Sequence, residues 1–494
     1  MYDVPTDASP DDLIVAFIQA ATAGMTLENA VQRIWSGIEF LPVWRQRQAS
    51  GVEISTRPWR PISTIKPDYI HVVRPHYDEF LKKPETASLA RHLLAEGIIP
   101  PIKFTDGVVR PVVELPPEAI ESHFMHLVSL LVRYVIEHYN TTQPDRGQII
   151  ESYRKFYQEA TEEVGEKICT VPLLHFISDL QNVQLAGSPF RLSPFTPQEK
   201  TALWNLTSVE LMSADVFGGT EYKLTATYPY NPQVAQTPSK PGIVEEAGQV
   251  ITAMRLLKGG NVGMQALYET SERAVMGIGA GGIGALGTYT PAWLGQRYEL
   301  TSADLPELLD TLAHLQTVEA KEESGGLRLA LRRFNQSYSR SNEFAEDRLL
   351  DLTISLESCL LTATEDELRY RLSLRGAALL SQARMGKVKE VYELLGLMYD
   401  VRSFFVHEGK NFLNLHTNKK GRAKDLKNKI DKITSSEGDR KFLWMCEDVV
   451  RDILREYVTR LTSDSSLMHI GKINEQLDSA ILDGLVPAQH RQGA

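Results

Sequence analysis

An arginine and a histidine near one predicted helix end are the residues best suited to chemistry in this sequence. Four residues separate Arg402 from His407, and Glu408 and Gly409 follow the histidine. A histidine ring can exchange protons near neutral pH, and a guanidinium can hold a phosphate and stabilise charge that develops on it. Gly409 is a typical helix stop, so we expect His407 in the last turn, where the helix dipole favours its protonated form. The pair fits cleavage of a phosphodiester bond.

Three successive predicted helices between residues 344 and 408 each carry a charged residue on an otherwise apolar stripe. These residues are Glu357, Arg375 and Arg402, which take positions where the helical period places core residues. An isolated buried charge is very costly, so each must find a partner or line a cleft. Either they form a structural ion-pair network that joins the helices, or they line a functional site.

The spacing of Arg402 and His407 sets a geometric condition. Residues five apart on a straight helix differ in direction by about 140°. The helix end must therefore unwind or bend, or the two side chains must converge from the rim of a cleft.

A basic segment follows His407, on a chain whose formal net charge is -10. Its candidate RNA-binding residues are Lys410, Lys419, Lys420, Arg422, Lys424 and Lys427, followed by Lys429 and Lys432. We expect contact with an RNA backbone, and Phe412 and His416 could stack on bases. The alternative is a solvated loop and helix face without a ligand.

Two other motifs favour structural interpretations. Gly277, Gly279 and Gly282 form a GxGxxG pattern, but its flanks fit neither the strand nor the helix of a dinucleotide site, so we predict a mobile surface loop over 276–287. His123 and His126 share a helix face, yet no further ligands lie nearby, so structural or solvent-exposed histidines are favoured and no metal site is expected.

The elements that must position these residues are mainly helices. Apolar periodicity predicts helices over about 10–24, 85–97, 117–140, 148–165, 245–257, 303–320, 325–340, 344–363, 367–384, 386–408 and 437–462. Extended segments are expected around 52–75 and 219–228, and Thr301 with Asp304 resembles a capping box. A Pro- and Gly-rich break lies near 227–242.

The expected fold class is mainly α, with a helix-rich mixed α+β N-terminal domain before a C-terminal helical bundle. We assign 1–240 to a sensing or regulatory region, 241–300 to a helix and Gly-rich loop, and 301–494 to the bundle, with a basic insertion at 410–432.

Composition excludes several classes of protein. The chain has 494 residues, 43% of them hydrophobic and 23% charged, which does not suit a mostly disordered protein. No secretory signal and no segment of about 20 apolar residues is evident, and three widely spaced cysteines suit a reducing compartment. These features predict a cytoplasmic protein without a membrane span.

Several blocks in the C-terminal half resemble the HEPN superfamily, in its Apea-like branch. The blocks are Phe334–Tyr338, Asp347–Leu352, Leu356–Ser358, Tyr370–Ala377 and Tyr399–Gly409, within a resemblance that covers about 245–460. The resemblance implies a helical bundle that pairs with a second copy. It also implies a metal-independent endoribonuclease motif, matched by Arg402 and His407, with Glu357 at the acidic position that faces the site. Arg375 and Ser403 are expected to support it.

The resemblance implies an RNase of a bacterial anti-phage defence or stress system that needs no cofactor. Its expected partners are RNA (tRNA or mRNA), a second copy or higher homo-oligomer and a phage-derived trigger, without membrane contact. Two alternatives remain: a non-catalytic module that binds RNA or nucleotide or dimerises as a scaffold, and the toxin of a toxin–antitoxin pair. Here the family's His-Gly reads His-Glu-Gly, which places the Glu408 carboxylate beside the catalytic position.

Overall fold

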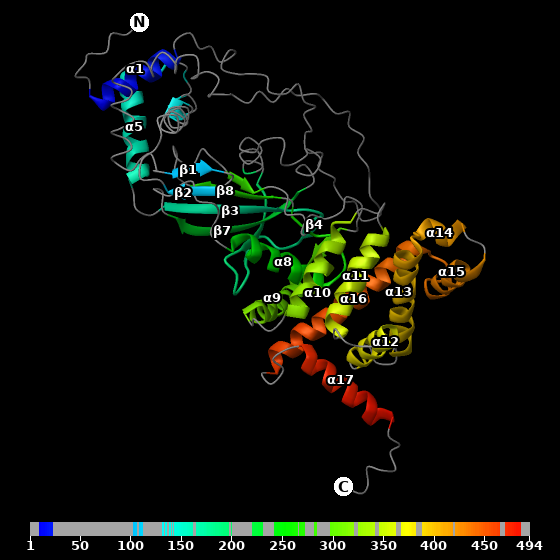
Figure 1. The fold of residues 1–494 in the computed structure, drawn as a ribbon. Coiled ribbons are helices and arrows are strands. Elements are labelled where there is room, and N and C mark those ends of the chain that lie inside the picture. Colours follow the sequence, from blue (N-terminus) through cyan, green and yellow to red (C-terminus); the bar gives the residue numbers. More distant parts are fainter. Residues whose placement is uncertain are drawn as a thin grey trace.

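The computed structural model describes most of the chain beyond residue 143. The described residues are 9–22, 102–105, 108–111, 131–132, 134–135, 138–139, 141, 143–161, 165–196, 199, 220–230, 242–264, 266–271, 281–283, 297–320, 325–340, 345–361, 367–381, 388–417, 420–464 and 470–485. This part of the chain is mainly helical, as predicted, and includes an antiparallel sheet (Figure 1).

The C-terminal part is a bundle of helices around one long central helix. Its members are α9 (Leu305–Ala320), α10 (Gly325–Tyr338), α11 (Ala345–Leu360), α12 (Leu368–Leu379), α13 (Val388–Glu408), α16 (Asp439–Ser463) and α17 (Ile470–Leu485). Phe442, Cys446, Val450, Ile453 and Tyr457 recur at helical spacing along α16 and are all buried. This stripe lets α16 pack against α9, α11, α12 and α13.

Two further helices form from the basic segment and lie on the outer side of α13 in Figure 1. They are α14 (Phe412–Thr417) and α15 (Gly421–Ile433). Ala423, Leu426 and Ile430 form the buried stripe of α15. The described part of the basic insertion is therefore a folded part of the bundle rather than a loop, which fixes the backbone positions of the lysines in α15.

The predicted helices within the described bundle are confirmed, with shifts of a few residues at their ends. The capping box at Thr301 and Asp304 is also confirmed: it opens the short 3-10 helix η3 (Ser302–Asp304), where Asp304 accepts from the Thr301 backbone N–H at 2.7 Å. The helix α17 was missed by periodicity.

A six-stranded antiparallel sheet packs beside the bundle. Its order is β5 (Val183–Gln184), β6 (Arg191–Pro194), β7 (Tyr222–Tyr230), β3 (Gly165–Leu173), β8 (Leu267–Ser271) and β9 (Gly281–Ile283). The predicted alternation in β7 is confirmed, because Tyr222, Leu224, Ala226 and Tyr228 are buried. A parallel pair of β4 (Phe176–Ser178) and β10 (Tyr298–Leu300), and the hairpin of β1 (Ile102–Thr105) and β2 (Val108–Pro111), complete the strands of the described residues.

The Gly-rich segment was predicted as a surface loop, and this is wrong for its described residues. Gly281–Ile283 form the edge strand β9, with Gly282 opposite Tyr268 in the register. Backbone pairing with β8 overrides the low strand propensity of glycine here. The sheet also crosses the boundary that we placed at residue 240, because β8 and β9 pair with β3 from the preceding region.

The helix α8 (Ile243–Leu257) joins the sheet to the bundle. Its buried residues belong to one hydrophobic core that extends from Cys169 in β3 to Leu477 in α17. At its end, the fully buried Arg255 donates from Nε to the Val262 carbonyl at 3.0 Å, and its guanidinium lies 4.3 Å from the ring centroid of Tyr338 in α10. The described sheet and bundle are therefore parts of one packed body.

At the N-terminal side, α1 (Pro10–Thr22) packs against α5 (Arg146–Thr161), and both match predicted helices. The helices predicted over 85–97 and most of 117–140, the extended segment at 52–75, and His123 and His126 lie outside the described residues. No helix in the described part is both long and apolar enough to cross a membrane. Cys169, Cys359 and Cys446 are free and buried, and burial raises the pKa of each thiol.

Candidate functional site around Arg402

The helix α13 positions the candidate catalytic pair. Val391, Leu395, Met398 and Val401 are buried along its inner face, which fixes the rotation of the helix against the bundle. Gly409 ends the helix with φ +60, and the Lys410 backbone N–H donates to the Phe405 carbonyl at 3.3 Å. The predicted helix stop at Gly409 is confirmed.

Arg402 lies beside Glu357 of the neighbouring helix α11. Arg402 Nη2 is 3.7 Å from Glu357 Oε2, and the two side chains are 20% and 22% exposed. Burial raises the pKa of Glu357, and the attraction of Arg402 only partly opposes that shift. The two charged residues expected at a shared site are therefore brought together.

The Arg402 guanidinium keeps hydrogen-bonding capacity for a ligand. Its Nε is buried and has no hydrogen-bond partner among the described residues. Its Cζ lies 6.0 Å from the ring centroid of Tyr399, one turn earlier on α13. The Nε donor is closed to a ligand, so a phosphate oxygen would have to meet the part of the guanidinium that solvent reaches, since the Arg402 side chain is 20% exposed.

His407 lies on a different face of α13 from Arg402. It is exposed in the last turn of α13, which continues as a regular α-helix to Glu408. The helix end neither unwinds nor bends, so Arg402 and His407 leave the helix about 140° apart, and convergence of the two side chains is the remaining condition that the spacing allows. Within one chain, the described structure brings Glu357 to Arg402 but does not bring His407 to them.

Arg375 belongs to a separate structural cluster. It is 3% exposed, and its Nε and Nη2 donate to the two carboxylate oxygens of Asp478 at 2.8 and 2.7 Å. Its Nη1 donates to the Leu360 carbonyl at 2.7 Å. The helix α17 supplies the carboxylate partner of Arg375, in line with the structural ion-pair alternative, and its support of the site around Arg402 stays a prediction.

Ser403, Glu408 and Arg422 form a tie between α13 and α15. Arg422 donates from Nη1 to Glu408 Oε1 at 3.0 Å and from Nη2 to Ser403 Oγ at 3.2 Å and the Asp400 carbonyl at 3.3 Å. Ser403 therefore supports the end of α13 rather than touching Arg402. The Arg422 guanidinium compensates the charge of the Glu408 carboxylate beside His407. This carboxylate therefore repels a bound phosphate less.

The other predicted RNA-binding residues differ in whether they have an ion-pair partner. Lys420 and Lys424 are exposed, Lys410 is half-buried, and none of the three has an ion-pair partner among the described residues. Lys427 pairs with Asp431 one turn along α15, and Lys419 lies outside the described residues.

The two residues proposed for base stacking in this segment are engaged elsewhere. Phe412 is buried, with its ring centroid 4.8 Å from that of Phe405, so the prediction that it stacks on bases is wrong. His416 pairs with Asp439 at the start of α16. The segment therefore offers charge through its lysines rather than aromatic surface.

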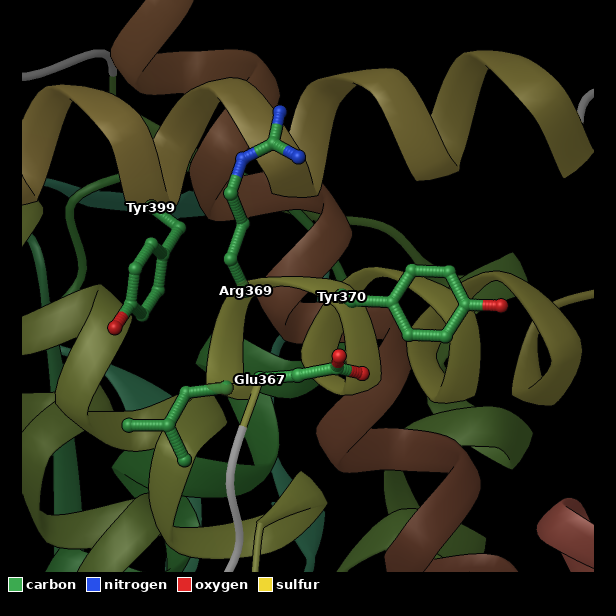
Figure 2. Close-up of a pocket in the computed structure, with 5 residues that line it drawn as sticks. Glu367, Arg369, Tyr370 and Tyr399 are labelled. Atoms are coloured by element: carbon green, nitrogen blue, oxygen red, sulfur yellow. The ribbon is translucent and has the colours of Figure 1, made fainter.

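A pocket that the sequence did not indicate lies one turn from Arg402. Figure 2 shows it between the start of α12 and the middle of α13, lined by Glu367, Leu368, Arg369, Tyr370 and Tyr399. Its volume is about 570 Å³. Aromatic and charged residues on helices do not stand out in a sequence, so only the packing of α12 on α13 reveals this group.

No known family model, curated protein or solved structure matches the chain. Function is therefore inferred from the chemistry around Arg402 and from the resemblance of the blocks between residues 334 and 409.

Proposed function

We propose that this protein is a metal-independent endoribonuclease of the HEPN type that acts in a bacterial anti-phage defence or stress system. The observation that carries the proposal is the partly exposed Arg402 guanidinium, paired with Glu357 at 3.7 Å, on the same helix as an exposed His407. The lysines of α15 add positive charge near the end of that helix.

In the proposed reaction, a base removes the proton from a ribose 2′-OH, and the 2′ oxygen attacks the adjacent phosphorus. The bond from phosphorus to the 5′ oxygen breaks, and an acid protonates that leaving oxygen. The products are a 2′,3′-cyclic phosphate and a 5′-OH end. Arg402 stabilises the charge on the phosphate oxygens, and His407 exchanges the protons.

The geometry of one chain favours a site shared by two copies. Arg402 and His407 diverge by about 140° on one straight helix, so the histidine that serves a given Arg402 comes more readily from a partner. A homodimer supplies two histidines, one as base and one as acid. Val406 and Leu413, which are exposed near His407, offer apolar surface for such pairing.

The biological assignment rests on the resemblance of the C-terminal half. An unregulated RNase is toxic to its own cell, so we assign the N-terminal region a restraining or sensing role toward a phage-derived or stress trigger. The RNA substrate in this proposal is tRNA or mRNA in the cytoplasm.

The decisive experiment compares purified wild type with Arg402→Ala and His407→Ala on one RNA and on DNA of the same sequence. We expect wild type to cut RNA equally in EDTA and in magnesium, to leave DNA intact, and to yield cyclic phosphate ends. Each variant should lose about 10² to 10⁴ in rate while it keeps the wild-type melting temperature.

His416→Ala is the matched control, because His416 is also near a helix end but pairs with Asp439. It should cleave at the wild-type rate. Activity that vanishes in EDTA and returns with a divalent ion contradicts the mechanism.

A non-catalytic RNA- or nucleotide-binding role, or a dimerising scaffold, is the second candidate. The divergence of Arg402 and His407 within one chain favours it if the protein stays monomeric. In that case the wild-type protein and His407→Ala both bind RNA, and neither of them cleaves it. A toxin of a toxin–antitoxin pair is a biological variant of the first proposal, tested by growth inhibition that a neighbouring gene relieves.

A further inference from the structure

The pocket beside Arg402 has the composition of a nucleobase site. Tyr399 and Tyr370 lie on opposite sides of Arg369 in Figure 2, and Glu367 extends below Tyr370. Aromatic rings are the surfaces on which unpaired bases stack, and a guanidinium plane serves in the same way. Tyr370 is 49% exposed, which leaves one side of a large aromatic ring open to a ligand.

Arg369 is held in place and is already neutralised. Its Nε and Nη2 donate to the two carboxylate oxygens of Asp400 at 2.7 and 3.1 Å. The absence of a side chain at Gly396 makes room for it, because a Cβ there would lie 3.0 Å from Arg369 Nη2. An arginine whose charge is compensated in this way offers a fixed flat surface rather than a strong phosphate site.

Glu367 decides which base the pocket suits. A carboxylate accepts hydrogen bonds and donates none when ionised, and it repels a phosphate. Guanine is the base that presents two adjacent donors, N1–H and the N2 amino group, to a single carboxylate. The carboxylate of Glu367 has no partner in the described part of the chain.

The position of the pocket relates it to the proposed cleavage site. Tyr399 lines the pocket and also lies beside Arg402, with 6.0 Å from the guanidinium carbon to the ring centroid. Tyr399 and Arg402 are three residues apart on α13, a rise of about 4.5 Å, which is less than the span of one nucleotide. Tyr399 therefore connects the pocket to Arg402, and we place the bound base on a nucleotide close to the phosphate at Arg402.

We propose that this pocket binds an unpaired guanine base of single-stranded RNA, stacked on Tyr370 and hydrogen-bonded to Glu367, on the side of Arg369 opposite Tyr399. This deepens the proposed function and rests on it for the placement of the phosphate. The pocket would make guanine the preferred base beside the cleaved bond, so the lysines of α15 contribute affinity while the pocket contributes sequence preference.

Binding of labelled heptanucleotides to the His407→Ala protein tests the pocket without cleavage. The probes are UUUGUUU, UUUIUUU with inosine, which lacks the N2 amino group, and UUUUUUU. We expect the guanine probe to bind best and inosine to weaken binding about tenfold, as for a lost hydrogen bond to a charged group. Glu367→Gln should remove the difference between guanine and inosine.

Substitution of the exposed ring gives the second measurement. Tyr370→Ala should weaken binding of the guanine probe about fivefold to a hundredfold, and Tyr370→Trp should restore it, since loss of one stacking ring has effects of this size. Trp444→Ala is the matched control, because Trp444 is also an exposed aromatic residue but does not line the pocket.

Two outcomes separate this proposal from the proposed function. Cleavage by the active protein without guanine preference, unchanged in Tyr370→Ala, overturns the pocket and leaves the ribonuclease proposal standing. Guanine-dependent binding through Tyr370 in a protein that never cleaves RNA supports the pocket and overturns the ribonuclease. Equal affinity for all three probes also overturns the pocket.

Discussion

Replacement of Glu357 by glutamine should reduce activity without a loss of stability. Burial raises the pKa of Glu357 in spite of the nearby Arg402, so the ionised carboxylate is less favourable in the folded chain than in the unfolded chain. For charges 3.7 Å apart, the gross attraction is about 1 kcal/mol in water and about 4 kcal/mol at an effective dielectric constant of 20. The raised pKa means that the cost of removing the carboxylate from water exceeds this gain.

We therefore expect Glu357→Gln to change the free energy of unfolding at pH 7 by less than about 1 kcal/mol, in either direction. Glutamine keeps the size of the side chain and a carbonyl oxygen for Arg402, but it no longer supplies the charge that orients the guanidinium. RNA cleavage should fall by about tenfold or more if that orientation serves catalysis.

Asp478→Ala is the matched control, because Asp478 pairs with Arg375, which also lies on an apolar stripe. Arg375 is 3% exposed and would keep only part of its hydrogen bonding, so we expect a cost of about 3 kcal/mol. This is the low end of the range for a broken buried pair, since the Asp478 side chain is 42% exposed and water can reach the gap.

Thermal unfolding and single-turnover cleavage of the two variants decide between a structural and a functional Glu357. The expected pattern is a near-normal melting temperature with low activity for Glu357→Gln, and the reverse for Asp478→Ala. If Glu357→Gln melts far below wild type and loses activity only to the extent that it is unfolded, Glu357 is a structural ion-pair residue and has no role in orienting Arg402 for catalysis.

Three further predictions follow from the geometry. Because the folded-state pKa of Glu357 is raised above its usual 4.5, the stability of wild type relative to Glu357→Gln should fall as pH rises above that value, measured by denaturant unfolding between pH 4 and pH 8. Joint replacement of Lys420, Lys424 and Lys429 by alanine should weaken RNA binding and reduce its log–log salt slope by about 2, since each single-strand phosphate contact contributes about 0.7; an unchanged slope means that this face is only solvated. Gly376→Ala should destabilise the protein by about 1–3 kcal/mol in thermal unfolding, because its Cβ would lie 2.4 Å from Leu395 Cδ1 in the contact of α12 with α13.

Helical periodicity predicted much of the described fold and part of the candidate site. The apolar stripes of α11 and α13 predicted that Glu357 and Arg402 occupy inward positions, and the structure places them 3.7 Å apart. The end of α13 at Gly409 was also visible, because glycine at the end of an apolar period is a local signal that acts without tertiary contacts.

Partners that are distant in sequence were not predictable. Asp478 pairs with Arg375 across 103 positions, and nothing in the local pattern of α17 marks it. Phe412 was assigned to base stacking because it follows the candidate motif, but packing against Phe405 buries it. The edge strand of Gly281–Ile283 depends on pairing with β8. The backbone hydrogen bonds of this pairing offset the entropy that the glycines lose when they are ordered.

The junction between sheet and bundle bears on how the trigger proposed for the N-terminal region would act on Arg402. Arg451 of α16 donates to the Arg255 carbonyl of α8 at 2.8 Å and to Glu447 at 2.5 Å, and Tyr338 donates to the same carboxylate at 2.7 Å. Separation of α8 from the bundle would leave the Arg451–Glu447 pair intact within α16. It would break the hydrogen bond from Arg451 to the Arg255 carbonyl and the contacts of the buried Arg255 with Asn335 and Tyr338 of α10, and it would expose the hydrophobic core that α8 shares with the bundle. Control by detachment of the sheet is therefore disfavoured. Because α16 packs against both α8 and α13, we expect a small shift of this one helix to be the route by which the proposed signal would reach Arg402.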